Sequence, residues 1–285
     1  MNIEVKNSGK YQVVRIDSEN IAPCMQVYRD RQLDGISISP HLGYKKRDLN
    51  FLKDYPDIKG IILGYADEID LTHISCAKEL EFITVTGNKQ PMDYGQFPKL
   101  KELRLEWHKK INLPKVATQL KLLDLSAYKP SDKSLKSLPA APNLERLELV
   151  QGNTISLDGI EKYSRLLSAE FHYVRNLNDI NAITAVRGLT SLKFHNCKNI
   201  TDYSVLCKLQ ELELLYIHNA GTIPSIKFVT QMKSLKTFRF IETAINDGDL
   251  TPLLRLKNIA FQNKKYYSHT QQEIRTHIGQ SIDEP

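Results

Sequence analysis

The chain has 285 residues, 41% of them hydrophobic, and a formal net charge of +6. This length and apolar content allow a packed core in one large domain or two ordinary ones. The small positive charge permits an anionic partner without requiring one. No apolar run approaches the roughly 18 residues of a membrane helix, so no membrane partner is expected.

The first segment, residues 1–32, is expected to cap the molecule. Its sequence IEVKNSGKYQVVRI alternates polar and apolar residues on both sides of a turn at Asn7–Gly9. This alternation predicts a β-hairpin that covers the first of the repeats that follow. The remainder, DSENIAPCMQVYRDRQ, leads into those repeats without clear periodicity.

The same segment has no long apolar stretch of the kind that secretory signals contain. The four cysteines of the chain are irregularly spaced, at Cys24, Cys76, Cys197 and Cys207. They fit neither the paired CxxC spacing of zinc sites nor a dense disulfide framework. Reduced thiols and a cytoplasmic location are therefore expected.

Residues 33–263 carry eleven copies of the motif L-x-x-L-x-L, with other apolar residues in place of some leucines. The clearest copies are LKELRL from Leu100, LKLLDL from Leu120, LERLEL from Leu144, LTSLKF from Leu189, LELLYI from Leu212 and LKTFRF from Leu235. Their middle apolar positions recur at intervals of 20 to 25 residues, at Ile36, Ile61, Ile83, Leu103, Leu123, Leu147, Ala169, Leu192, Leu215, Phe238 and Ile259. Such a period predicts one short strand per repeat, stacked about 4.8 Å apart in a parallel sheet that needs a cap at both ends.

This pattern resembles the leucine-rich repeat family, and the short repeats resemble those of its bacterial, internalin-like members. The family motif continues with Asn or Cys two residues after the third apolar position. Asn88 and Cys197 match it, whereas other repeats have His108, Tyr128, Gly152, Val174, Ala220 and Thr243 there, so some turns are expected to be irregular. The resemblance implies an α/β repeat solenoid with a curved parallel sheet on its concave side and short 3₁₀ or helical turns on its convex side.

The last segment, residues 264–285, is expected to form the second cap. In HTQQEIRTHI, Thr270 precedes Glu273 by three residues, which is the spacing of a capping box at the start of a helix. A short helix there would shield the last strand, and GQSIDEP is expected to be a loose tail.

Alternate residues of a strand point to opposite faces, so the positions between the leucines form columns on the concave face. The middle column contains Arg104, Asp124, Glu148, Glu170, Lys193, Tyr216 and Arg239. Its three consecutive acids repel one another by a little under ~1 kcal/mol per pair in bulk water at strand spacing. Because repeat solenoids bind through this kind of surface, we predict that the column contacts a partner with a basic patch; the alternative is a solvated polar face.

The third column contains Glu106, His172, His195 and His218, with the three histidines in consecutive repeats. Three interpretations stay open: ordinary polar surface, contact with a partner, or a zinc site, for which ring nitrogens must approach the metal to about 2.0–2.1 Å. Trp107 follows its strand directly, as Tyr128 and Tyr173 follow theirs. Each of these aromatic residues either anchors an interface or packs inward.

The sequence contains no GxSxG, HExxH, GxxxxGK[ST] or post-strand GxGxxG motif. The carboxylates of the middle column would lie on an open surface instead of a cleft, and Cys197 in the ladder position is expected to be a structural thiol. We therefore expect no enzymatic activity and no cofactor. Basic residues are scattered among acids, so no nucleic-acid partner is expected either.

The sequence thus predicts a monomeric, cytoplasmic, non-enzymatic protein that binds another protein across its fourth to tenth repeats. Small bacterial repeat proteins of this resemblance include immunity proteins that neutralise a toxin of the same cell, and this is our narrower hypothesis. Two alternatives stay open. One is a metal- or small-ligand-binding module that uses His172, His195 and His218, and the other is an exported effector that binds host proteins.

Overall fold

The computed structural model describes residues 3–280. Residues 281–285, most of the predicted loose tail, lie outside the described residues, as do residues 1–2. Two α-helices lie near the ends of the described chain, α1 (Ile21–Asp30) and α2 (Gln271–Ile278). The strands are β1 (Val5–Ser8), β2 (Tyr11–Arg15), β3 (Gly35–Ile38), β4 (Gly60–Leu63), β5 (Phe82–Val85), β6 (Met92–Asp93), β7 (Glu102–Glu106), β8 (Ile111–Asn112), β9 (Leu122–Tyr128), β10 (Arg146–Gly152), β11 (Ser168–His172), β12 (Ser191–His195), β13 (Leu214–Ile223), β14 (Thr237–Ile245) and β15 (Asn258–Phe261).

Most return segments between these strands contain one short 3₁₀ turn. These turns are η1 (Pro40–Leu42), η2 (Asn50–Asp54), η3 (Thr72–Cys76), η4 (Tyr94–Gln96), η5 (Ile160–Lys162), η6 (Asn181–Ala185), η7 (Ser204–Lys208), η8 (Lys227–Gln231) and η9 (Thr251–Arg255). The expected short 3₁₀ turns are therefore confirmed, and the only α-helices among residues 3–280 lie outside the repeats.

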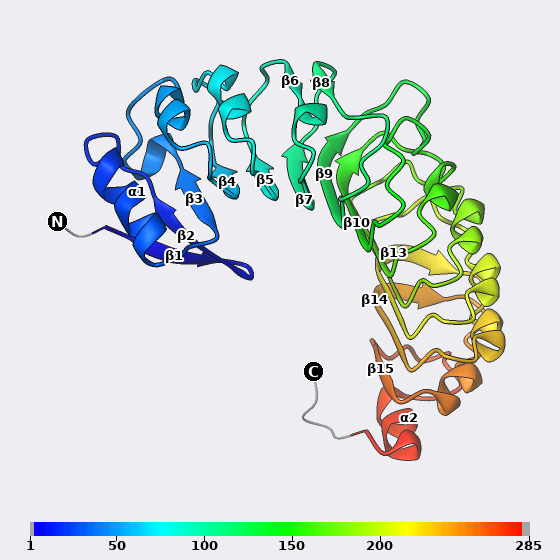
Figure 1. The fold of residues 1–285 in the computed structure, drawn as a ribbon. Coiled ribbons are helices and arrows are strands. Elements are labelled where there is room, and N and C mark those ends of the chain that lie inside the picture. Colours follow the sequence, from blue (N-terminus) through cyan, green and yellow to red (C-terminus); the bar gives the residue numbers. More distant parts are fainter. Residues whose placement is uncertain (1–2, 281–285) are drawn as a thin grey trace. The chain divides into compact units, whose positions relative to one another are not determined.

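The described chain forms two compact units. The first contains the residues up to Leu125 together with Pro139–Ala141, and the second contains Ser126–Leu138 together with the residues from Pro142 onward. In each unit the strands line one side and the 3₁₀ turns line the other (Figure 1). The predicted strands β3, β4, β5 and β7 belong to the first unit, β10 to β15 belong to the second, and β9 crosses the boundary.

The register of the sheet follows the sequence repeat. In the first unit the middle apolar positions pair in parallel as Ile36↔Ile61↔Ile83↔Leu103. In the second unit they pair as Leu147↔Ala169↔Leu192↔Leu215↔Phe238↔Ile259. Equivalent residues of successive repeats are therefore direct neighbours, which confirms the repeat prediction within each unit.

The core of each unit consists of the inward side chains of the motif. In the second unit the rings of Phe171 and Phe194 stack with centroids 5.5 Å apart, and both side chains are fully buried. Burial of such a side chain stabilises the fold by about 1.5–3 kcal/mol. The ladder positions behave as the family motif implies: the Asn88 side-chain amide donates to the carbonyls of Ala66 (2.6 Å) and Ile69 (3.1 Å), and Cys197 Sγ donates to the Phe171 carbonyl (3.4 Å).

Most repeats of the second unit have a left-handed corner directly after the third column, either just past the end of the strand or within it. The residue that follows the third column has φ between 50° and 63° in six repeats, at Ala127, Gln151, Tyr173, Asn196, Asn219 and Glu242. This conformation costs a non-glycine residue about 1–2 kcal/mol, although asparagine tolerates it better than most residues. The corner turns the chain away from the sheet directly after the column that contains the histidines.

The N-terminal hairpin reaches further than the sequence suggests. Strands β1 and β2 pair antiparallel, and β2 extends the parallel sheet at β3. The hairpin tip also folds over the outward face of the first unit: the Tyr11 ring stacks on Phe82 with centroids 3.9 Å apart, and Lys10 forms an ion pair with Glu102 of β7. Glu102 is only 5% exposed, so it is a buried partner of the hairpin.

The last strand is covered by α2. Thr270 is its N-cap: its hydroxyl accepts from the Glu273 N–H (3.2 Å), and the Glu273 carboxylate accepts from the Thr270 N–H (2.7 Å). Ile274 on this helix is fully buried. Beyond the helix, the side-chain amide oxygen Oε1 of Gln280 accepts from the Ile259 N–H of β15 (3.0 Å), which satisfies a donor at the edge of the sheet.

Candidate functional site

The outward side chains of β10 to β15 form a continuous surface, which we call the open face. Its middle column pairs in register as Glu148↔Glu170↔Lys193↔Tyr216↔Arg239. All five side chains are partly exposed. The open face thus carries acidic, aromatic and basic groups side by side, in the order that the repeat predicts.

Four predicted site residues belong to the first unit, where the surroundings differ. Arg104 Nη1 donates to Glu102 Oε2 (3.0 Å), and its Nε lies 3.9 Å from Asp124 Oδ2. Glu106 Oε2 accepts from the Gly87 N–H (3.3 Å), and Trp107 is half-buried directly after β7. Arg104 is therefore engaged beside the hairpin contact, and these four residues contribute to a separate part of the predicted surface.

The three histidines form a connected group of rings on the open face. His172 and His195 stack with centroids 4.3 Å apart and planes 18° apart, whereas His218 meets His195 edge-on at 5.8 Å. Tyr216 lies 4.7 Å from the His195 ring. Burial, and then the neighbouring His172 and His218, lower the pKa of His195 to about 4. His195 is therefore a neutral hydrogen-bonding group at neutral pH.

Beside this ring group, His172 lies between two carboxylates. His172 Nε2 is 3.3 Å from Glu170 Oε2 and 3.6 Å from Glu148 Oε1. The other oxygen of Glu170 accepts from Lys193 Nζ at 3.0 Å. The hydrogen bond with His172 and the bond and charge of Lys193 outweigh the effect of burial and lower the pKa of Glu170 to about 2.

A hollow of about 390 Å³ lies on the open face next to these groups. Lys193 and Arg239 flank it, Tyr216 lies between them, and His195, Leu214, Leu215 and Thr237 complete its lining. Arg239 Nε donates to Asn258 Oδ1 (3.3 Å), which helps to hold the guanidinium in place. The hollow combines apolar walls with cationic groups, a composition that suits a protruding side chain with an acidic group.

Sequence reasoning missed Leu214 and Thr237, which also line this hollow. They belong to the first outward column, which contains the residue directly before each middle apolar position. The same repeat spacing predicts this column, so both residues could have been found from sequence. Glu242 was also missed: its Oε2 lies 3.5 Å from His218 Nε2. Glu242 lies within β14, which is longer than the motif predicts, because β13 and β14 continue beyond the corner after a register shift between His218 and Gly221.

The aromatic residues that follow their strands divide between the two alternatives. Tyr128 is 2% exposed and packs inward, while Tyr173 is 46% exposed at a left-handed corner. Cys197 is fully buried, and this burial raises the pKa of its thiol to about 12. A thiol in this state is a poor nucleophile, in agreement with its ladder role.

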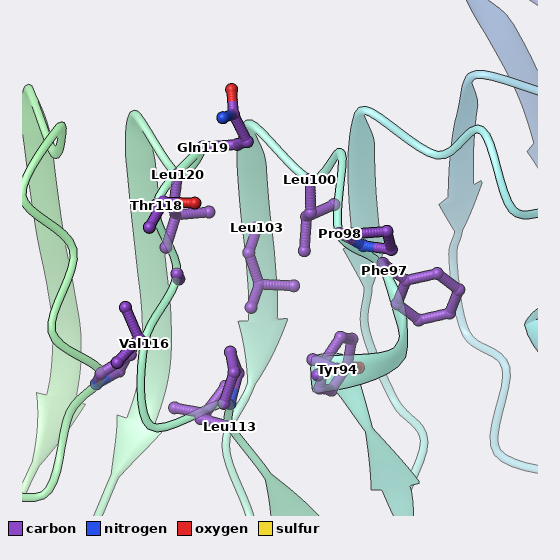
Figure 2. A pocket seen from close by; sticks show the side chains of 14 residues that line it. Tyr94, Phe97, Pro98, Leu100, Leu103, Leu113, Val116, Thr118, Gln119 and Leu120 are labelled. Atoms are coloured by element: carbon purple, nitrogen blue, oxygen red, sulfur yellow. The ribbon is translucent and has the colours of Figure 1, made fainter.

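A second, apolar pocket of about 220 Å³ lies in the first unit (Figure 2). Its wall includes Tyr94, Phe97, Leu103, Leu113 and Val116. The return segment after β7 forms only the short strand β8 and contains no helical turn between residues 107 and 121. Fewer inward side chains are thus available to fill the space beside β7, and Val116 stays 59% exposed.

None of the helices in residues 3–280 is long and apolar enough to cross a membrane. Among the same residues, one group of three side chains could hold a metal ion, and it consists of Glu148, Glu170 and His172. The structure therefore assembles a set of potential ligands different from the three histidines considered from sequence.

Among known proteins, the chain is similar to solved structures and not to any family model or curated sequence. The functional domain of InlJ from Listeria monocytogenes matches with a TM-score of 0.51 and 16% identity, over 79% of this chain and 55% of that one. The mouse RP105/MD-1 complex matches with a TM-score of 0.54 and 16% identity, over 76% of this chain and 39% of that one.

The chain therefore spans about half the length of the InlJ domain and less of the mouse chain. At this level of identity the likeness concerns the fold. The eleven sequence repeats, the parallel pairing of equivalent positions and the short 3₁₀ turns agree with both matches. Each unit therefore has the fold of a leucine-rich repeat solenoid, with a parallel sheet and short 3₁₀ turns.

Proposed function

We propose that this protein binds another protein through the open face of its second unit. The observation that carries this proposal is the hollow between Lys193 and Arg239, with Tyr216 between them and the histidine rings beside it. Arginine and tyrosine are enriched among residues that dominate binding energy, especially where a pocket receives a partner's side chain. Repeat solenoids commonly bind along such extended surfaces.

The two units differ in how their outward faces are used. In the first unit the hairpin tip covers Phe82 and Glu102, which are 3% and 5% exposed. In the second unit the side chains of Glu148, Glu170 and Lys193 are 32%, 20% and 32% exposed. The open face therefore leaves its charged groups accessible to a partner, which supports placing the interface there.

The charge pattern of the open face calls for a partner with both a basic and an acidic group, whereas the sequence suggested only a basic patch. Glu170 is already neutralised by Lys193 at 3.0 Å, so the acidic stripe is weaker than the sequence suggests. The partner that fits this face presents a basic group toward Glu148 and an acidic group toward Arg239. One of the two matched structures is itself a complex of two proteins, RP105 and MD-1, which is compatible with this use of the fold.

The test compares two double variants with equal changes in charge. Lys193→Glu with Arg239→Glu reverses the rim of the hollow, while Lys208→Glu with Lys233→Glu reverses two exposed lysines on the opposite, 3₁₀ side of the same unit. Each variant and the wild type serve as bait in lysate of the source organism, and bound proteins are identified by mass spectrometry.

We expect a specific partner that the wild type and the Lys208/Lys233 variant retain and the Lys193/Arg239 variant loses. A purified pair should then lose at least roughly tenfold in affinity, since truncation of an interface anchor costs at least ~2 kcal/mol and a tenfold loss corresponds to ~1.4 kcal/mol. If a partner stays bound to the Lys193/Arg239 variant with unchanged affinity, the open face is not the interface.

A narrower proposal is that the partner is a toxin that this protein neutralises in the cytoplasm. The cysteines at 24, 76, 197 and 207 are all unpaired, which suits a reducing compartment. Co-expression tests the idea: the wild type should restore growth of cells that express the captured partner, and the Lys193/Arg239 variant should not. A captured partner without toxicity would remove the immunity hypothesis and leave the binding proposal intact.

A further inference from the structure

The arrangement around His172 has the dimensions of a metal coordination sphere. Zinc binds imidazole nitrogen at about 2.0–2.1 Å and carboxylate oxygen at about 2.0–2.2 Å, so two ligands of a tetrahedral ion lie about 3.4 Å apart. His172 Nε2 lies 3.3 Å from Glu170 Oε2 and 3.6 Å from Glu148 Oε1. The three ligand atoms all lie within 4.8 Å of one another. A small contraction of the carboxylates would thus place one ion among all three.

The strand register explains why these side chains converge. Glu148 and Glu170 are paired neighbours in the middle column of β10 and β11. His172 lies two residues after Glu170 on the same strand, so its ring projects from the same face. The ligands therefore come from two adjacent, hydrogen-bonded strands, which are more rigid supports than loops.

Two neighbours hold the ligands in place. The His172 ring stacks on His195 at 4.3 Å, which restricts the plane of the imidazole and leaves Nε2 directed at the carboxylates. Lys193 Nζ binds Glu170 Oε1 at 3.0 Å, while Oε2 of the same carboxylate faces His172. Hydrogen bonds to ligating carboxylates of this kind commonly orient them in metal sites.

The donor set also has a suitable charge. Two carboxylates and the Lys193 ammonium sum to one negative charge, which favours a bound divalent cation. One nitrogen and two oxygens favour a borderline ion such as Zn²⁺ over Mg²⁺ or Ca²⁺, which prefer oxygen alone. The side chains of Glu148, Glu170 and His172 are 32%, 20% and 22% exposed, so the ion can enter from solvent.

We propose that Glu148, Glu170 and His172 form a binding site for one divalent transition-metal ion, with Zn²⁺ as the best fit. The three protein ligands leave a fourth coordination position directed toward solvent on the open face. His195 and Lys193 are positioning residues, and His218 is not a ligand. This inference is independent of the proposed protein-binding function and does not involve catalysis.

Isothermal titration calorimetry with zinc chloride tests the site, on full-length protein without an affinity tag and under reducing conditions. We expect one Zn²⁺ per chain in the wild type. Affinity should fall at least roughly tenfold in both His172→Ala and Glu148→Gln, because each removes a direct ligand. The matched control, His218→Ala, removes a histidine from the same column and should leave the zinc affinity unchanged.

Cobalt(II) gives a second measurement that reports geometry. The wild type should develop visible absorption of a Co²⁺ ion with nitrogen and oxygen ligands, and Glu148→Gln, which keeps the side-chain shape, should lose it. Far-UV circular dichroism of each variant verifies the fold.

Two results would overturn the proposal. One is the absence of stoichiometric zinc binding by the folded wild type at roughly 100 μM metal, a generous limit for a site with three protein ligands. The other is zinc binding that survives His172→Ala and Glu148→Gln unchanged, which would assign the metal to other residues.

Discussion

Tyr173 illustrates how a single backbone angle limits what a residue can do. Its φ of 57° turns the chain away from the sheet directly after His172, and its side chain is 46% exposed. With φ positive, this conformation costs a non-glycine residue about 1–2 kcal/mol. Glycine adopts the same angle without that cost, although it loses more entropy on folding.

We therefore expect Tyr173→Gly to be more stable than Tyr173→Ala by roughly 1 kcal/mol, because both remove the ring and only glycine relieves the strain. Urea unfolding of the two variants measures the difference. Ser168, at the other end of β11, is the control position, since it does not have a positive φ. At that position glycine should be the less stable of the two, and the same order at both sites would contradict the strain argument.

At the level of single residues, the sequence predicted which side chains are neighbours on the sheet, but not whether each one is buried or exposed. The period placed Lys193, Tyr216 and Arg239 side by side because sheet register follows directly from repeat spacing. It could not separate Tyr128, which is buried, from Tyr173, which is exposed, because that difference depends on the path of the chain after the strand. The proposed metal ligands could not be predicted from sequence either. Only the side-chain conformations show that the ring nitrogen of His172 lies beside Glu148 and Glu170.

Among the elements, the β1–β2 hairpin departs furthest from its sequence prediction. Gly35 and Gly60 have no side chains, so the outward face of the sheet is open at these two positions. A Cβ at Gly60 would lie 1.9 Å from the Phe82 ring. Phe82 therefore lies across this patch, and Tyr11 stacks on it in turn. The two glycines precede their middle apolar positions, yet nothing in their spacing shows which distant ring occupies the space.

The carboxylate of Glu102 makes the docking of this hairpin dependent on pH. Burial alone would raise its pKa, but hydrogen bonds from Lys10 and Tyr11 and the charge of Arg104 outweigh that effect and hold the pKa below its usual value. A lowered folded pKa stabilises the native state above the unfolded pKa, which is about 4.3 for glutamate. This contribution is lost as the pH falls below that value and through the folded pKa.

We expect Glu102→Gln to be less stable than the wild type at pH 7 by about 1.5–3 kcal/mol, the range for hydrogen bonds to charged groups. The difference should be smaller at pH 3, which lies below the unfolded pKa of about 4.3, because the contribution of the lowered folded pKa is being lost there. Amide hydrogen exchange of Tyr11–Arg15 at both pH values reports hairpin docking directly. Glu79→Gln is the control, since Glu79 forms only an exposed ion pair with Lys99; an equal loss in both variants would contradict the assigned role of Glu102.

At the scale of the whole molecule, the reactivity of the four cysteines tests whether the interior of the repeats is closed to solvent. Cys24 and Cys197 are 1% and 0% exposed, and burial raises the pKa of both thiols. Cys76 and Cys207 lie on 3₁₀ turns with intermediate exposure. We expect a thiol reagent such as DTNB to modify two cysteines rapidly in the native protein and all four in denaturant. Rapid native modification of Cys197, identified by mass spectrometry, would contradict the packing of the ladder.

The fold as a whole was the most predictable level, because eleven motif copies constrain one another through their common period. The division into two compact units was not predicted. It falls where the motif copies themselves are regular, between Leu123 and Leu147, next to a long return segment from residue 129 to 145 that contains no 3₁₀ turn. Composition gives no signal for such a boundary.

The left-handed corners have a consequence for the size of any contact area. Because they bend the chain about five residues into the paired region, they limit the regular part of the face of β10 to β15 before the corners to a strip about 16 Å wide and about 24 Å long, or on the order of 400 Å². A standard interface buries about 800 Å² on each partner. The strands alone thus supply about half of a stable footprint. The remainder must come from segments beyond the corners, where Tyr173 already projects into solvent, so specificity among related partners should depend on these loops more than on the columns.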